Sequence, residues 1–196
     1  MRLSLVTAPA AELATTAEAK SWLRVSHSSE DTLIDGLVKS ARGFAEGFTN
    51  RAFVNQTWEL SMDTFPGCRE IELPLPPLSS VTSVKYYDTA GTQQTMSSAD
   101  YTVKVWAGDY APYGSIVLGY GKSWPSSRGY IDDVTIRFVA GYGAAASNVP
   151  ELIKSAVKQL VAQMYDQRGE DVVGLTVQKP TLAARNLLWP FRVGIV

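Results

Sequence analysis

Apolar residues on one helical face dominate residues 148–169 and constrain the fold more than any other feature of the chain. They recur in adjacent pairs, each four residues after the last: Leu152 and Ile153, Ala156 and Val157, Leu160 and Val161, Met164 and Tyr165. Because an α-helix turns once in about 3.6 residues, this spacing places every pair on one broad face. Such a face needs other elements to cover it, so the stretch predicts a long helix at the centre of a packed domain.

Both ends of this predicted helix carry typical boundary residues. Asn148 can accept hydrogen bonds from the first free N–H groups, and Glu151 stands where the partner in a capping box would. Pro150 is tolerated in a first turn, because its missing N–H has no acceptor there. Gly169, directly after Arg168, suits the left-handed residue that ends many helices.

A second long helix is predicted to end near residue 48, with residues 28–31 as its N-terminal cap. Its apolar positions also share one face: Leu33, Ile34, Leu37, Val38, Ala41, Phe44, Ala45 and Phe48. We expect the two wide faces to cover each other. Three glycines interrupt this helix, each at a cost of about 1 kcal/mol that close helix contact would offset: Gly36, Gly43 and Gly47.

A short helix comes before these two. Thr15 and Glu18 have the spacing of a capping box, and the helix is predicted to run to about Arg24. Its apolar face comprises Ala19, Trp22 and Leu23. Residues 1–14 are expected to form an extended lead-in that packs or docks through its leucines.

After Asn50 the apolar period changes from that of a helix to the alternation of strands. About six short strands are predicted. They lie around residues 58–62, 71–75, 84–86, 101–105, 116–118 and 134–139. A turn is expected at residues 88–91, and Pro74, Pro76 and Pro77 indicate a strand exit.

The pattern predicts an α+β fold, with a helical base of two long helices and one short one, and an inserted antiparallel β subdomain. We expect a single domain over residues 1–171, with the base at 1–55 and 148–171 and the insertion at 56–147. Residues 172–196 are expected to be an extended C-terminal docking tail. At 196 residues and 45% apolar content, the chain is able to bury a substantial core.

The charge is small but uneven, with a formal net charge of −1. Residues 56–148 hold six Lys or Arg and nine Asp or Glu, whereas residues 172–196 hold Lys179, Arg185 and Arg192 and no acid. This balance argues against DNA binding by general electrostatics and suits docking to a protein partner. The single cysteine, Cys68, allows no intramolecular disulfide, so synthesis in a reducing interior is expected.

No stretch reaches the roughly 18 apolar residues of a membrane-spanning helix, and the N-terminal residues make a poor signal peptide. We therefore expect no membrane association.

Catalytic motifs are incomplete. Lys122 follows a glycine, as in a phosphate-binding loop, but Ile116 stands where the first glycine is needed. Ser155 and Lys158 lack the partner motifs of acyl-transfer enzymes, and His27 is the only histidine. We expect no catalytic, cofactor-binding or metal-binding residues, and no cofactor.

Two segments are candidate contact sites. The aromatic, glycine-rich loop at 119–130 offers Tyr120, Trp124 and Arg128 for contact with another subunit or protein. The apolar cluster at 187–193 either packs back on the core of its own chain or is held out for a partner.

A resemblance to a known family rests on the order of several motifs. In chain order they are Arg51 and Ala52, Gln56 to Trp58, the proline-rich residues 73–78, the strand at 81–87, Trp124 and Pro125, residues 140–143, Val149 and Pro150 with Tyr165 and Arg168, and finally residues 187–192. With these motifs in this order, the chain resembles the head–tail connector (adaptor) proteins of long-tailed bacteriophages, prophages and gene transfer agents.

The resemblance implies a structural virion protein without enzymatic activity. Such adaptors form a ring of about twelve copies beneath the portal, extend the DNA channel and offer a platform to the stopper or tail protein. Double-stranded DNA passes through without specific binding. The resemblance implies a place at the head–tail interface of the virion, after assembly in the bacterial host cytoplasm. It also implies that the C-terminal segment contacts the portal through Leu187, Leu188, Trp189, Pro190, Phe191 and Arg192.

Two other functions fit parts of the pattern. A non-enzymatic β-rich module that binds a ligand or protein, carried on a helical stalk, would present exposed aromatics in one patch. A carboxylate-dependent hydrolase would need acids that converge on the aromatic loop, and adjacent residues such as Asp132 and Asp133 point to opposite faces of a strand.

Overall fold

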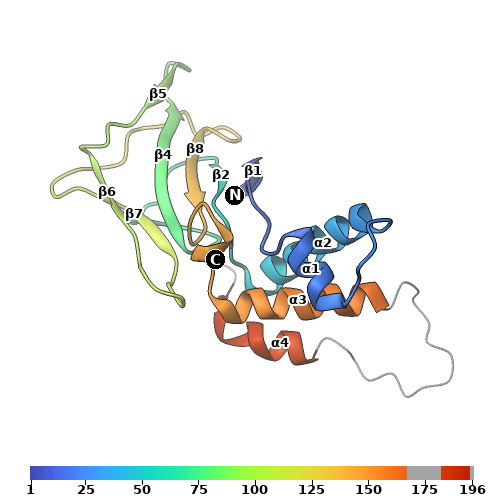
Figure 1. Ribbon diagram of the computed structural model, residues 1–196. Coiled ribbons are helices and arrows are strands. Elements are labelled where there is room, and N and C mark those ends of the chain that lie inside the picture. The colour runs from blue at the N-terminus through green and yellow to red at the C-terminus, as the bar shows by residue number, and fades with distance from the viewer. Residues whose placement is uncertain (167–181, 195–196) are drawn as a thin grey trace.

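A computed structural model describes residues 1–166 and 182–194. The chain forms two units that lie side by side, a group of helices and a pair of β-sheets (Figure 1). Each unit has its own cluster of buried apolar side chains. The α+β class expected from the sequence is confirmed.

The helical unit contains α1 (Thr16–Leu23), α2 (Asp31–Thr49), α3 (Glu151–Asp166) and α4 (Leu182–Leu188). Two short 3₁₀ turns accompany them, η1 (Ala146–Asn148) and η2 (Trp189–Phe191). None of the helices in the described part of the chain is both long and apolar enough to cross a membrane.

Helices α2 and α3 cover each other's apolar faces, as their residue spacing predicts. The positions that α3 buries are Ile153, Ala156, Val157, Leu160 and Val161. Leu152, at the rim of this face in the first turn, stays exposed. The three glycines of α2 make no close contact within the chain, because a Cβ built on any of them would meet nothing within 4 Å.

Of the predicted helix caps, one is confirmed and two are wrong. Thr15 and Glu18 form the capping box of α1, with Glu18 N–H 3.2 Å from Thr15 Oγ1. The residue before α2 is Glu30, which caps no N–H with its side chain. Asn148 belongs to η1, where its Oδ1 accepts from Ala145 N–H, and α3 begins three residues later.

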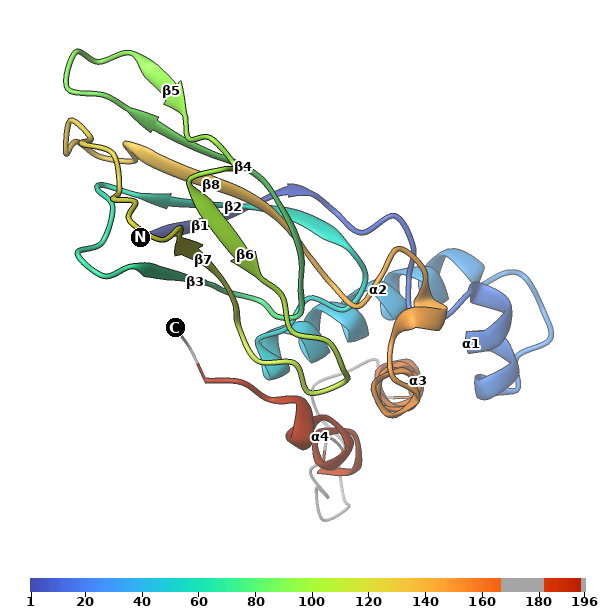
Figure 2. The same cartoon turned by 90° about the vertical axis from the view of Figure 1, so that its left-hand side faces the viewer.

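The β unit consists of two antiparallel sheets (Figure 2). The larger has the order β1-β2-β8-β4-β5, formed by β1 (Arg2–Thr7), β2 (Gln56–Met62), β8 (Val134–Ala140), β4 (Leu78–Tyr87) and β5 (Gln93–Thr95). The smaller has the order β3-β7-β6, formed by β3 (Glu70–Leu73), β7 (Gly114–Leu118) and β6 (Tyr101–Lys104). In the larger sheet, Leu60, Ile136 and Val84 lie in register on three neighbouring strands and are buried in the core of this unit.

Two strands differ from the prediction. Residues 2–7, assigned to the helical base, form β1 and pair with β2 in the larger sheet. Pairing between residues more than 50 positions apart, such as Leu3 with Leu60, leaves no periodic trace in either segment alone. Strand β5 was missed because Gln93, Gln94 and Thr95 are all polar and exposed.

The C-terminal segment corrects a further prediction. Residues 182–191, expected to be extended, form α4 and η2 and pack on the helical unit. The reason is spacing: Ala184, Leu188 and Phe191 recur at helical intervals and are buried together. Residues 172–181 of the expected tail lie outside the described residues, as do Arg168 and Gly169.

The chain passes between the two units first at residues 8–15, then at 50–56 and again at 140–150. The last two passages lie close together. These passages touch, with Tyr142 N–H donating to Phe53 O at 2.9 Å and Asn55 N–H donating to Gly143 O at 2.9 Å. Gly141 makes the approach possible. Its φ is +139°, and a Cβ there would lie 2.6 Å from Asn55 N.

Candidate functional site

The segment after α3 that carries the predicted contact residues lies against the outer side of the helical unit, with α4 alongside α3 (Figures 1 and 2). Its six candidate residues differ in how much of each side chain is exposed. Leu188 and Phe191 point inward and are 0% and 1% exposed, and Leu187 is half-buried. Trp189 is 62% exposed, and Pro190 and Arg192 are also exposed. The segment therefore has a buried anchoring side and an outward side.

Three consecutive residues at the end of α2 hold the chain that follows α4. Thr49 O accepts from Val193 N–H at 3.0 Å, and Asn50 Nδ2 donates to Val193 O at 2.9 Å. Arg51 Nε donates to Phe191 O at 2.5 Å. The end of α2 thus fixes the backbone of the last described residues.

Arg51 also ties this segment to the β unit. Its guanidinium is almost fully buried, and Nη1 donates to Ala111 O at 2.8 Å. Burial lowers the pKa of Arg51, while the nearby Tyr142 and Tyr113 oppose this effect. Carbonyl oxygens accept hydrogen bonds from this buried charge. The arrangement is not evident from the sequence, because no acidic residue is spaced to pair with Arg51.

An outward cluster combines aromatic rings with two guanidinium groups. We call it the C-terminal patch, and it comprises Phe44, Phe48, Arg185, Trp189 and Arg192. The Phe44 and Phe48 rings are stacked with centroids 6.4 Å apart, and the Trp189 ring lies 6.4 Å from that of Phe48. The Arg185 guanidinium carbon is 5.8 Å from the Phe48 centroid, and that of Arg192 is 5.6 Å from it. The sequence pointed to Trp189 and Arg192, but it did not show that α2 completes the cluster.

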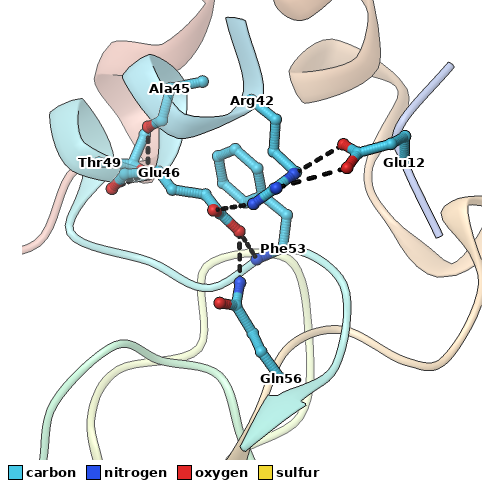
Figure 3. A network of polar contacts seen from close by, with 7 residues as sticks. All are labelled: Glu12, Arg42, Ala45, Glu46, Thr49, Phe53 and Gln56. Carbon is cyan, nitrogen blue, oxygen red and sulfur yellow. Dashed lines mark hydrogen bonds and ion pairs between the residues drawn. The ribbon is translucent and has the colours of Figure 1, made fainter. Parts of the chain in front are cut away.

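A polar network fastens α2 to the strand that begins the β insertion (Figure 3). Glu46 accepts from Phe53 N–H at 3.0 Å, from Gln56 Nε2 at 2.6 Å and from Arg42 Nη1 at 2.7 Å. Arg42 Nε also donates to Glu12 at 2.7 Å. Burial raises the pKa of Glu46, against the lowering effect of the Phe53 N–H and of Arg42. The network joins the N-terminal segment, α2 and β2, so it positions the two units relative to each other.

The residues of the aromatic loop that were predicted to contact another protein mostly contact other parts of this chain. Trp124 stacks on Phe65 with ring centroids 5.1 Å apart, and its Nε1 donates to Cys68 O at 2.7 Å. Arg128 pairs with the buried Asp133 at 2.6 Å. The Arg128 hydrogen bond is the main reason that the pKa of Asp133 lies below its ordinary value. Of the three candidates, only Tyr120 is fully exposed.

Among the described residues, the side chains considered as catalytic or metal-binding groups do not come together in one site. Within residues 1–166 and 182–194, no cluster of three or more His, Cys, Asp or Glu side chains is placed to hold a metal ion. His27 lies in the turn between α1 and α2, with Nδ1 2.8 Å from Ser29 Oγ. Cys68 is an exposed loop thiol that donates to Glu70 O. An apolar hollow of about 330 Å³ is lined by Met1, Leu3, Asn50, Leu60, Pro74, Leu75, Tyr113 and Gly194.

Residues 14–105 match the model of a family described as Phage gp6-like head-tail connector protein. The match begins just before α1 and ends just after β6, so it includes α2 and most of the β unit. The resemblance to connector proteins that rested on the order of motifs is therefore confirmed over this part of the chain. A comparison with curated proteins gives no match.

Solved structures with a similar fold come from gene transfer agents (GTA). A chain in the neck of an empty GTA particle computed with C6 symmetry is 24% identical, with a TM-score of 0.80. A chain in the virion of a native GTA particle is 24% identical, with a TM-score of 0.79. A third, in the neck of a native GTA particle computed with C12 symmetry, is 23% identical, with a TM-score of 0.70. Each likeness covers 100% of this chain and 97% of the other, so the fold is shared along the whole length.

Proposed function

We propose that this protein is a head–tail adaptor, a non-enzymatic component of the neck of a phage-like particle. One observation carries the proposal. A chain whose residues 14–105 match a connector family also shares its complete fold with chains of GTA necks and virions. The proposed location is the head–tail interface of the virion, after assembly in the bacterial host cytoplasm.

In the proposed assembly, copies of the chain form a closed ring of twelve that extends the DNA channel of the portal. The sixfold and twelvefold symmetries of the similar neck structures support a ring with this number of copies. The formal net charge of −1 fits a wall along which DNA slides, because sequence-independent binding needs a surplus of Lys and Arg.

The C-terminal segment is the proposed portal contact. Leu188 and Phe191 anchor it to the helical unit, which leaves Trp189, Pro190 and Arg192 to meet the portal. Exposed Trp and Arg are the residue types that contribute most to protein interfaces. The stopper or tail protein binds on the other side of the ring, where Tyr120 is a candidate contact.

Co-purification with the portal protein of the same particle tests this proposal, with the mass of the complex measured by light scattering. We expect capture of about one copy per portal subunit, since a ring repeats one contact many times. Trp189→Ala combined with Arg192→Gln should abolish capture, whereas Trp22→Ala, which removes another exposed Trp, should not.

Point variants serve better than truncation after Asp171, because truncation would also remove the buried Leu188 and Phe191. The proposal fails if the wild-type chain stays monomeric and is not captured. If capture survives in the double variant, the adaptor function stands and the proposed portal contact is wrong.

A further inference from the structure

We propose that the C-terminal patch binds an acidic protein surface, whose carboxylates reach Arg185 and Arg192 around an apolar centre at Trp189. This inference rests on the proposed function and adds to it the chemistry of the partner. It also extends the contact to α2 and α4, beyond the residues that the sequence singled out.

The first step is that the two guanidinium groups pair with no acid among the described residues. Four other arginines pair with carboxylates at distances of 2.6–2.9 Å: Arg2 with Asp132, Arg42 with Glu12 and Glu46, Arg128 with Asp133, and Arg137 with Glu59. Within residues 1–166 and 182–194, neither Arg185 nor Arg192 has a carboxylate oxygen within 4.0 Å. Within the described residues, no acid pairs with either charge, so we infer that both are available to an external group.

The second step is that aromatic rings hold the two guanidinium groups in place. Both lie near the Phe48 ring. Arg185 is also over Phe44 at 5.9 Å, and Arg192 is also over Trp189 at 5.6 Å. A planar guanidinium stacked on a ring keeps its N–H edge free for hydrogen bonds. Because contact with a ring restricts a side chain, less conformational freedom is lost when a carboxylate binds.

The third step concerns the surface beside Arg192. Trp189 is 62% exposed and contributes to a shallow hollow of about 440 Å³ with Asn50, Arg192, Val193 and Gly194. A large exposed ring beside preordered arginines has the composition of an interface hot spot. An apolar side chain of the partner fits the hollow, and flanking carboxylates fit the guanidinium forks.

DNA phosphate has similar charge, but the patch suits a protein better. Two arginines release few counterions from a duplex, and phosphate makes no use of an apolar ring at the centre. The patch has the exposed Trp189 beside Arg192, whereas a DNA-binding surface typically has a row of cations along a groove.

Binding of the full-length chain to an immobilised portal ring tests the inference. Arg185→Gln with Arg192→Gln should weaken the affinity about tenfold or more, and binding should become less sensitive to salt. Arg185→Lys with Arg192→Lys should recover only part of the loss, because lysine lacks the planar fork. The matched control, Arg24→Gln with Lys39→Gln, removes two exposed charges elsewhere and should change the affinity less than about twofold.

Each outcome decides a different claim. If the wild-type chain binds the portal and the Arg185 and Arg192 variant binds equally well, the adaptor function survives and this inference is wrong. It is also wrong if that variant loses binding only to a 30-base-pair DNA duplex, run in parallel, and not to the portal. If the wild-type chain does not bind the portal, the proposed function fails and this inference fails with it. Circular dichroism melting of each variant excludes unfolding as the cause of lost binding.

Discussion

At the scale of single residues, the buried Arg51 joins distant parts of the chain. It is 2% exposed and donates to carbonyl groups from two distant segments, Phe191 O and Ala111 O. Buried carbonyls left without a donor cost about 1–3 kcal/mol each, so the loss of this side chain affects both segments. Arg51 therefore connects the C-terminal segment, α2 and the β unit.

Replacement of Arg51 by Met keeps much of the volume and removes both hydrogen bonds. We expect a loss of about 2–4 kcal/mol in the free energy of unfolding, measured by urea denaturation. The exposed Arg24→Gln is the control and should cost less than about 0.5 kcal/mol. An unchanged urea midpoint for Arg51→Met would show that these hydrogen bonds do not stabilise the chain.

The pair of Arg128 and Asp133 predicts a specific pH dependence. The Arg128 hydrogen bond holds the pKa of Asp133 below the ordinary value, so the folded state favours the charged carboxylate more than the unfolded state does. The stabilisation is full above the unfolded-state pKa of about 3.9 and is lost as the pH falls through the lower folded-state pKa.

Asp133→Asn should therefore be less stable than the wild-type chain at neutral pH. The difference should shrink as the pH is lowered from about 5 towards 2, because the wild type loses its advantage there. Urea midpoints measured at several pH values give the comparison. A difference that stays constant across this range would contradict the assigned pKa shift.

At the scale of elements, α4 shows both what the sequence allows and what it hides. Ala184, Leu188 and Phe191 have helical spacing, so the information for a packed helix was present. The neighbouring Leu187, Trp189 and Val193 obscured this spacing and favoured the prediction of an extended tail. The long helices α2 and α3 were predictable because their apolar faces extend over several turns, and α1 because of its capping box.

Leu188→Ala tests the packing of α4. The side chain is 0% exposed, and its truncation leaves a cavity, so we expect a loss of about 2–5 kcal/mol. Trp189→Ala, which removes the exposed neighbour, should cost about 1 kcal/mol or less. Thermal unfolding distinguishes the two. A neutral Leu188→Ala would mean that the segment does not pack on the helical unit.

The glycines provide a second test at this scale. Gly43 lies in α2 with open space where a Cβ would be, so Gly43→Ala should stabilise the isolated chain by about 1 kcal/mol. Gly141→Ala should do the opposite, since its φ of +139° and the backbone of Asn55, 2.6 Å away, leave no room. Urea denaturation of both variants checks the contrast, and a destabilising Gly43→Ala would contradict it.

Strand pairing and polar contacts account for what the sequence could not reveal. The alternation of strands β2, β3, β4, β6, β7 and β8 is visible in single segments. The pairing of β1 with β2 and the contacts of Glu46 with Phe53 and Gln56 depend on which segments meet in space. The same holds for the C-terminal patch, where Phe44 and Phe48 of α2 meet Arg185, Trp189 and Arg192.

At the scale of the whole molecule, two apolar cores are joined by a polar and closely packed junction. The network around Glu46 and the approach at Gly141 fix the helical unit on the β unit. This arrangement suits a subunit that must transmit contacts from one neighbour to another. In the proposed adaptor, the outward side of the C-terminal segment meets the portal, and the exposed Tyr120 of the β unit is a candidate contact for another neighbour.

Cryo-electron microscopy of this protein mixed with its portal ring tests the adaptor proposal most directly. The account predicts a closed ring coaxial with the portal, one copy per portal subunit, with the C-terminal patch in the contact and a continuous axial channel. Unbound monomers beside bare portal rings would contradict the proposal, as would copies that bind the portal without closing a ring.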